Sequence, residues 1–88
     1  MSASDVGAEK GLTVYGTTWC PSVRRVRRFL DRRQIPYRWV DIDEDAEGRA
    51  FVEQVNNGMR SVPTIVFEDR SILVEPSIAE LAAKLGVE

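Results

Sequence analysis

"TTWCPSVRR", from Thr17 to Arg25, lies between two segments whose residue patterns predict different secondary structure. The run GLTVYG before it is rich in β-formers and bounded by glycines, which predicts a strand over Leu12 to Tyr15. After it, Val23, Val26 and Leu30 recur at i, i+3 and i+7, which predicts a helix with one apolar stripe. The quoted stretch is therefore expected to be the turn that carries the chain from a strand into a helix.

Cys20 is expected at the N-terminus of that helix, and it is the only cysteine of the chain. Pro21 suits the first helical turn, because the N–H that it lacks would have no intrahelical acceptor there. Unpaired backbone N–H groups and the helix dipole favour the thiolate, which is the form that attacks disulfides. The alternative is a small hydrophobe in the core, but a residue between Trp19 and Pro21 at a helix start is expected to be exposed.

A lone cysteine limits the chemistry of the chain. Val23 stands where a second sulfur would complete a Cys-x-x-Cys pair, so an internal disulfide is excluded. The chain has no histidine, which also excludes a Cys-His dyad and a closed Cys/His zinc site within one chain. A single cysteine fits a reducing compartment, and we expect a cytoplasmic protein.

The segment YRWVDID, which starts at Tyr37, alternates and predicts a second strand. Tyr37 and Trp39 would lie on one face, and Val40 and Ile42 on the other. A strand, a helix and a strand over this length form a βαβ unit, in which the two strands are parallel.

The remainder of the chain predicts a helix, two strands and a last helix. The acidic run DEDAE opens the first of these helices, with Ala50, Phe51 and Val55 as its expected buried side. Two strands joined by the short turn EDRS must be antiparallel. Ser77 with Glu80 forms a capping box for the last helix. The order β-α-β-α-β-β-α predicts an α/β fold, a four-stranded mixed sheet flanked by helices in a thioredoxin-like arrangement.

Length and charge narrow the class of protein further. A chain of 88 residues supports one core, so we expect a single domain over residues 11–88 after a disordered lead-in over residues 1–10. The net charge of −2 gives no electrostatic footprint for nucleic acid, although six arginines lie between Arg24 and Arg33. We interpret these arginines as a solvated face. No apolar run approaches the roughly 20 residues of a transmembrane helix, so no membrane association is expected.

Three motifs together resemble the glutaredoxin family: Trp19–Pro21 at the strand-to-helix turn, Val62-Pro63 at the start of the third strand, and Pro76-Ser77 before the last helix. The stretches VYGTTWC, VDIDED, VNNGMRSVPTIVF and EPSIAEL are most similar to mycoredoxins, the glutaredoxin-like proteins that use mycothiol in actinobacteria. The resemblance covers nearly the whole chain after residue 10. The chain differs from the dithiol members of the family at Val23, where they have a cysteine. Its CPSV loop also differs from the Cys-Gly-Phe-Ser loop of the monothiol members that carry iron-sulfur clusters.

The resemblance implies roles for the matching residues. Cys20 would be the nucleophile, and Val62, before a cis-proline, would bind the cysteinyl part of a small thiol. Glu75 disfavours an acidic ligand, so mycothiol is expected as the external thiol, with glutathione as the alternative. The residues expected to bind the small thiol are Trp19, Pro21, Ser22, Val23, Arg25, Val62, Pro63, Glu75, Pro76 and Ser77.

One sulfur is enough to remove a small-thiol cap from a protein, because a second small-thiol molecule can regenerate the cysteine. We therefore expect a monothiol oxidoreductase that acts on S-thiolated client proteins. A further hypothesis is that the arginines, among them Arg27 and Arg28, dock acidic patches on those clients. A monomer without a metal or tightly bound cofactor is expected. The alternatives are a module in which two chains share a [2Fe–2S] cluster through Cys20, and a redox-inactive interaction protein.

Overall fold

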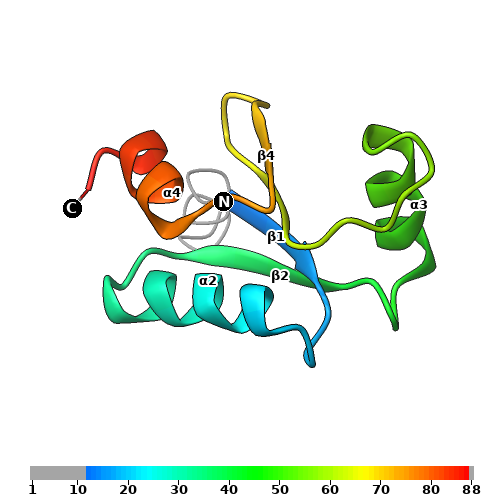
Figure 1. The fold of residues 1–88 in the computed structure, drawn as a ribbon, viewed down its shortest axis with the longest axis horizontal. Helices are drawn as coiled ribbons and strands as arrows, with labels where there is room; N and C mark the ends of the chain where they lie inside the picture. Colours follow the sequence, from blue (N-terminus) through cyan, green and yellow to red (C-terminus); the bar gives the residue numbers. More distant parts are fainter. Residues whose placement is uncertain (1–11, 88) are drawn as a thin grey trace, which may run out of the picture.

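A computed structural model describes residues 12–87, and the lead-in predicted for residues 1–10 lies outside them. Within the described part the helices and strands follow in the predicted order (Figure 1). They are β1 (Leu12–Gly16), α2 (Pro21–Arg32), β2 (Tyr37–Asp41), α3 (Ala46–Val55), β3 (Thr64–Val66), β4 (Ile72–Val74) and α4 (Ile78–Leu85).

The four strands form one mixed sheet in the order β2-β1-β3-β4. β1 runs parallel to β2, with Val14 opposite Trp39. β1 is antiparallel to β3, with Val14 opposite Ile65, and β3 is antiparallel to β4. The predicted thioredoxin-like sheet is thus confirmed, with the strand that leads to Cys20 at its centre.

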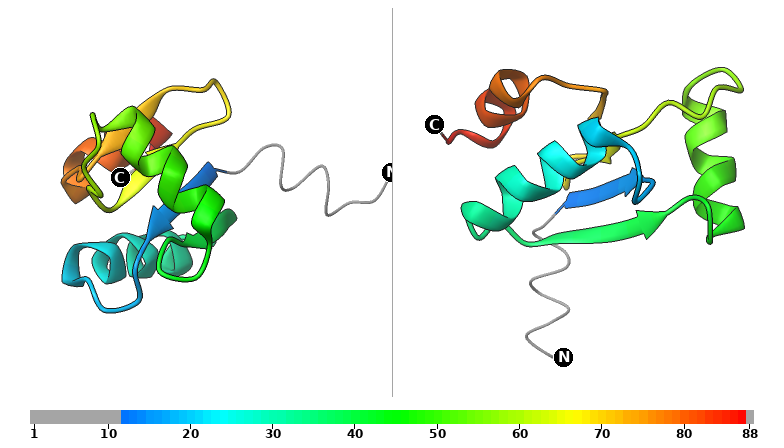
Figure 2. Two further views of the ribbon diagram at one scale, coloured as in Figure 1. Left: turned by 90° about the vertical axis from the view of Figure 1, so that its right-hand side faces the viewer. Right: turned by 60° about the horizontal axis from the view of Figure 1, so that its bottom comes forward.

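One face of the sheet carries the main core. Val14 and Ile65 are fully buried there against Val26 and Leu30 of α2 and Leu81 of α4. Figure 2 shows α2 running alongside the sheet. Burial of each such side chain contributes about 1.5–3 kcal/mol, so this cluster holds α2 and its N-terminus in a fixed position on the sheet.

The other face of the sheet packs against α3. Tyr15, which alternates with Val14, stacks on Phe51 with ring centroids 4.8 Å apart. Gly48 approaches β2 so closely that a Cβ at this position would lie 2.5 Å from Val40 Cγ1. Only glycine therefore allows this distance between α3 and the sheet.

The predicted buried side of α3 is partly wrong. Ala50 is exposed, whereas Phe51 and Val55 are half-buried, and the fully covered residues are Gly48 and Val52. The cause is the glycine: it carries no apolar side chain for a periodicity pattern to detect, yet its backbone makes the nearest approach to the sheet.

The ends of α4 match the sequence. The Ser77 hydroxyl accepts from Glu80 N–H at 3.0 Å, and Glu80 Oε1 accepts from Ser77 N–H at 2.8 Å, so the predicted capping box is present. Gly86 ends the helix in the left-handed conformation with φ of 74°.

Among residues 12–87, no helix has the length and apolarity needed to cross a membrane.

Candidate functional site

Cys20 is the N-cap residue of α2. Its backbone is extended, with φ −79° and ψ 123°, and its carbonyl accepts from Arg24 N–H at 3.0 Å, which is the first bond of the helix. Pro21 occupies the first turn, as predicted. The side chain is half-buried and forms no cap hydrogen bond, so the thiol is not a core residue. The N–H groups of the first turn lack intrahelical acceptors and can stabilise a thiolate there.

Val23 fills the position where a second sulfur would stand. Its side chain is fully buried, and a Cβ built on Gly16 would lie 2.8 Å from both of its methyl groups. The first turn of α2 is thereby pressed against the end of β1. Val23 consequently holds the helix N-terminus, and with it Cys20, against the sheet. Because its side chain is fully buried, it presents no surface to a small thiol, and its predicted role in binding one stays a prediction.

Trp19 lies exposed beside Cys20, with 65% of its surface accessible. Its indole Nε1 donates to Asp43 Oδ2 at 2.9 Å, and Arg24 Nε donates to the Thr18 carbonyl at 3.3 Å. The sequence did not reveal Asp43 as a partner of Trp19. The available signal was the parallel pairing of β1 with β2, because the carboxyl ends of parallel strands meet at the same edge of a sheet.

Thr17 is a further residue that sequence reasoning missed. It is 3% exposed, and its hydroxyl has no hydrogen-bond partner among the described residues. A buried polar group normally has such a partner, which makes Thr17 an exception in the turn that leads from β1 to Cys20.

The Val62-Pro63 loop lies next to the Cys20 turn. Tyr15 pairs with Thr64, which places the segment after β1 beside the segment before β3. The Val62–Pro63 peptide bond is cis, and Pro63 is buried. Thr64 Oγ1 donates to the Ser61 carbonyl at 2.7 Å and so anchors the loop from within the sheet.

The segment before α4 joins this loop directly. Glu75 N–H donates to the Pro63 carbonyl at 2.8 Å, and Glu75 adopts a left-handed conformation with φ of 51°. Pro76 has no N–H, and Ser77 N–H already donates to Glu80. Both backbone N–H groups of this segment therefore already have acceptors, and two carboxylates, from Glu75 and Glu80, lie at the start of this helix.

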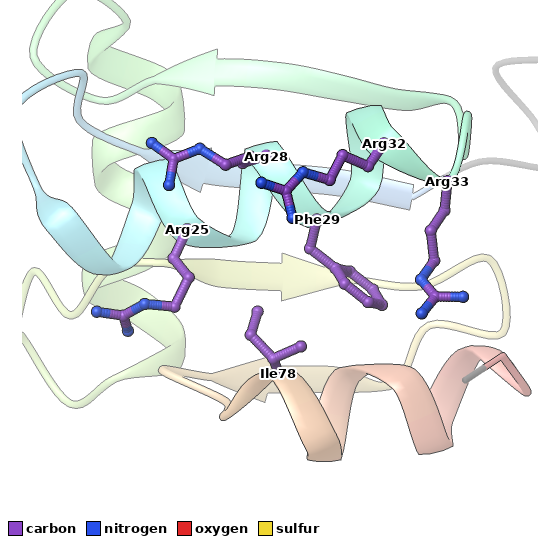
Figure 3. A pocket seen from close by; sticks show the side chains of 6 residues that line it. All are labelled: Arg25, Arg28, Phe29, Arg32, Arg33 and Ile78. Carbon is purple, nitrogen blue, oxygen red and sulfur yellow. The ribbon is translucent and has the colours of Figure 1, made fainter.

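The remaining predicted residues divide between two places. Ser22 is exposed in the first turn of α2, close to Cys20 in sequence. Arg25 instead lines a groove between α2 and α4, together with Phe29 and Ile78 (Figure 3). The structure thus gathers the Cys20 turn, the Val62-Pro63 loop and the Glu75 segment at one edge of the sheet, while Arg25 faces the groove.

Comparisons with known proteins agree with this geometry. The glutaredoxin family profile matches residues 12–72. A protein of Mycobacterium tuberculosis named "Putative glutaredoxin" is 43% identical over 74 residues, which cover 84% of this chain and 88% of that protein. Mycoredoxin 1 of Corynebacterium glutamicum is 38% identical over 74 residues, covering 84% of this chain and 91% of that protein. The glutaredoxin of Archaeoglobus fulgidus superposes with a TM-score of 0.69 at 27% identity, covering 97% and 95% of the respective chains.

Proposed function

The chain belongs to the glutaredoxin family, and on that premise we propose that it is a monothiol oxidoreductase that removes small-thiol caps from proteins. The observation that carries the proposal is the pairing of a half-buried Cys20 at a helix N-terminus with a fully buried Val23 at the second-sulfur position. Such a site has a nucleophile but no resolving thiol.

The first step is attack of the Cys20 thiolate on the disulfide that joins a client cysteine to a small thiol. A bond forms between Cys20 and the sulfur of the small thiol, and the client leaves as a thiolate that takes up a proton. The helix N-terminus stabilises the attacking anion. Trp19, fixed by its bond to Asp43, would cover the bound small thiol from one side.

The second step regenerates the enzyme. A second small-thiol molecule, as its thiolate, attacks the mixed disulfide at the sulfur of the bound small thiol and releases Cys20. The oxidised product is the disulfide of the small thiol, so electrons and atoms balance without a second protein sulfur. With an ordinary protein disulfide the client itself would be bound to Cys20, and this chain has no second thiol to release it.

Mycothiol suits the site better than glutathione. Glutathione carries two free carboxylates, and these would meet Glu75 and Glu80 at the start of α4, where the Glu75 and Ser77 amides already have acceptors. Mycothiol carries neutral sugars in place of those carboxylates, which avoids like-charge repulsion. A reducing cytoplasm, where such thiols are kept reduced, and action as a monomer complete the proposal.

The test is steady-state turnover of one peptide capped with mycothiol or with glutathione, each with its own thiol as reductant. We expect turnover that requires Cys20 and a higher kcat/KM with mycothiol. A Cys20→Ser variant is the control. Equal or better turnover with glutathione would refute the choice of thiol, and absence of turnover with both would refute the enzyme and favour the cluster-sharing or redox-inactive alternative.

A further inference from the structure

A groove between α2 and α4 is lined by arginines and by two apolar side chains. Its volume is about 490 Å³, within the range of roughly 300–1,000 Å³ found for ligand pockets. Phe29 from α2 and Ile78 from α4 point toward each other across it, with Arg25 near one end and Arg33 near the other (Figure 3). The groove is lined by Arg25, Arg28, Phe29, Arg32, Arg33 and Ile78.

The positive charge of this groove is not balanced from within the described residues. Six arginines and a single aspartate lie between Pro21 and Arg33, although the whole chain has a net charge of −2. Within residues 12–87 the ion pairs are Arg60–Glu53 and Lys84–Asp69, and neither includes a groove arginine. Like charges three or four residues apart on a helix repel each other and destabilise it. A bound anion would remove that repulsion.

The structure sorts the arginines by what they contact. The Arg27 guanidinium lies 4.0 Å from the centroid of the Trp39 ring, and its Nε donates to the Tyr37 hydroxyl at 3.3 Å. Arg27 is thus engaged on the flank toward β2, whereas Arg28 faces the groove. The two neighbours that the sequence suggested as one docking pair therefore lie on different surfaces.

We propose that this groove binds an acidic segment of the client protein, in which an apolar side chain lies between carboxylates. The apolar side chain would pack on Phe29 and Ile78, and the carboxylates would pair with the surrounding guanidinium groups, whose planar forks match carboxylate geometry. The proposal rests on the proposed function, because it names which capped clients the enzyme prefers.

The dimensions set the length of the segment. Arg25 to Arg33 spans eight residues of helix, or about 12 Å, which corresponds to three or four residues of extended peptide at ~3.3 Å each. The groove begins about 7.5 Å along α2 from Cys20, at a rise of ~1.5 Å per residue. An acidic segment a few residues from the capped cysteine can therefore reach it.

Binding is tested on the Cys20→Ser protein, which has no thiol to react. The probes are the peptides Gly-Glu-Leu-Glu-Gly and Gly-Lys-Leu-Lys-Gly, followed by amide chemical-shift mapping of the isotope-labelled chain. The acidic peptide should bind with shifts concentrated on α2 and α4, and its Kd should rise several-fold when salt increases from about 0.05 M to about 0.3 M. Equal binding of both peptides, or shifts that map elsewhere, would overturn the proposal.

Charge reversal sharpens the test. Arg28→Glu with Arg32→Glu should weaken binding of the acidic peptide about tenfold and improve binding of the lysine peptide. The matched control is Arg38→Glu with Arg70→Glu, which changes net charge equally at exposed positions outside the groove. An equal loss in the control would refute the groove as the site. Concentration-dependent shifts without peptide would also overturn the proposal, because the occupant would then be a second copy of the chain.

The same two peptides, each extended by a cysteine that carries a mycothiol cap as a mixed disulfide, separate this proposal from the proposed function. If the acidic peptide binds in the groove but no capped peptide is turned over, the docking surface stands and the enzymatic proposal fails. If both capped peptides are turned over with equal KM, the enzyme stands and the docking proposal fails.

Discussion

The contact between Val23 and Gly16 gives a quantitative test of why a valine stands beside the nucleophile. Gly16→Ala would place a Cβ 2.8 Å from both Val23 methyl groups and 3.2 Å from the Trp39 ring. Overpacking of this kind costs about 1–3 kcal/mol of the free energy of unfolding. Val23→Ala removes two buried methyl groups at about 0.8 kcal/mol each and leaves a cavity, for a loss of about 2–3 kcal/mol.

The double variant tests whether the two side chains compete for one space. The new methyl group on residue 16 would enter the volume that Val23 vacates, so the two losses should not add. We expect a favourable coupling of at least about 1 kcal/mol, limited by the remaining contact with Trp39. Equilibrium unfolding in urea of the four proteins, under reducing conditions, provides the free energies.

The matched control replaces Val26 in place of Val23. Val26 is equally buried on α2 but lies outside the three nearest contacts of a Cβ at Gly16. Gly16→Ala combined with Val26→Ala should therefore be additive to within about 0.5 kcal/mol. Additivity in the Val23 pair as well would refute the claim that Val23 fixes the helix start against β1.

Three further predictions concern the nucleophile, its neighbour and a distant turn. Val23→Cys should form a disulfide with the nucleophile on oxidation, seen by intact mass, and should raise the rate at which ordinary protein disulfides are reduced. Absence of this bridge would contradict the assigned position of the second sulfur. Asp43→Ala should release Trp19 and lower turnover of the capped peptide. The free energy of unfolding should change by less than about 1 kcal/mol, because the lost hydrogen bond is exposed. Unchanged turnover would show that Trp19 does not contribute to the site. Hydrogen bonds from the Ser71 hydroxyl and N–H hold the pKa of Asp69 well below its usual range, so Asp69→Asn should lower the free energy of unfolding at pH 7. This deficit should shrink as the pH falls below about 4, where the carboxyl of the unfolded chain takes up protons. A deficit in urea unfolding that does not change with pH would contradict this.

The elements of the fold were predictable because each has a local signature. The stripe of Val23, Val26 and Leu30 and the capping box at Ser77 lie within single helices, and both are present in the structure. The β1 and β2 strands are separated by one helix, which requires them to be parallel. These features depend on neighbours in sequence, so propensity and periodicity suffice.

The features that could not be predicted from the sequence depend on contacts between residues far apart in the chain. The partner of Trp19 is 24 residues away, and Asp43 is one of several acidic residues in its run. Arg25 and Arg27 look alike in sequence, yet only the packing of α4 and β2 decides that one faces a groove and the other a tryptophan ring. The buried side of α3 was misassigned because its nearest approach is made by Gly48.

The central claim is that Cys20 takes the small thiol and frees the client. It is tested most directly by mixing the protein with one equivalent of a mycothiol-capped peptide, without added reductant, and measuring the intact mass of the products. The account predicts one mycothiol on the chain and a reduced peptide in solution, with no adduct on Cys20→Ser. A chain that carries the peptide, or no adduct at all, would contradict it.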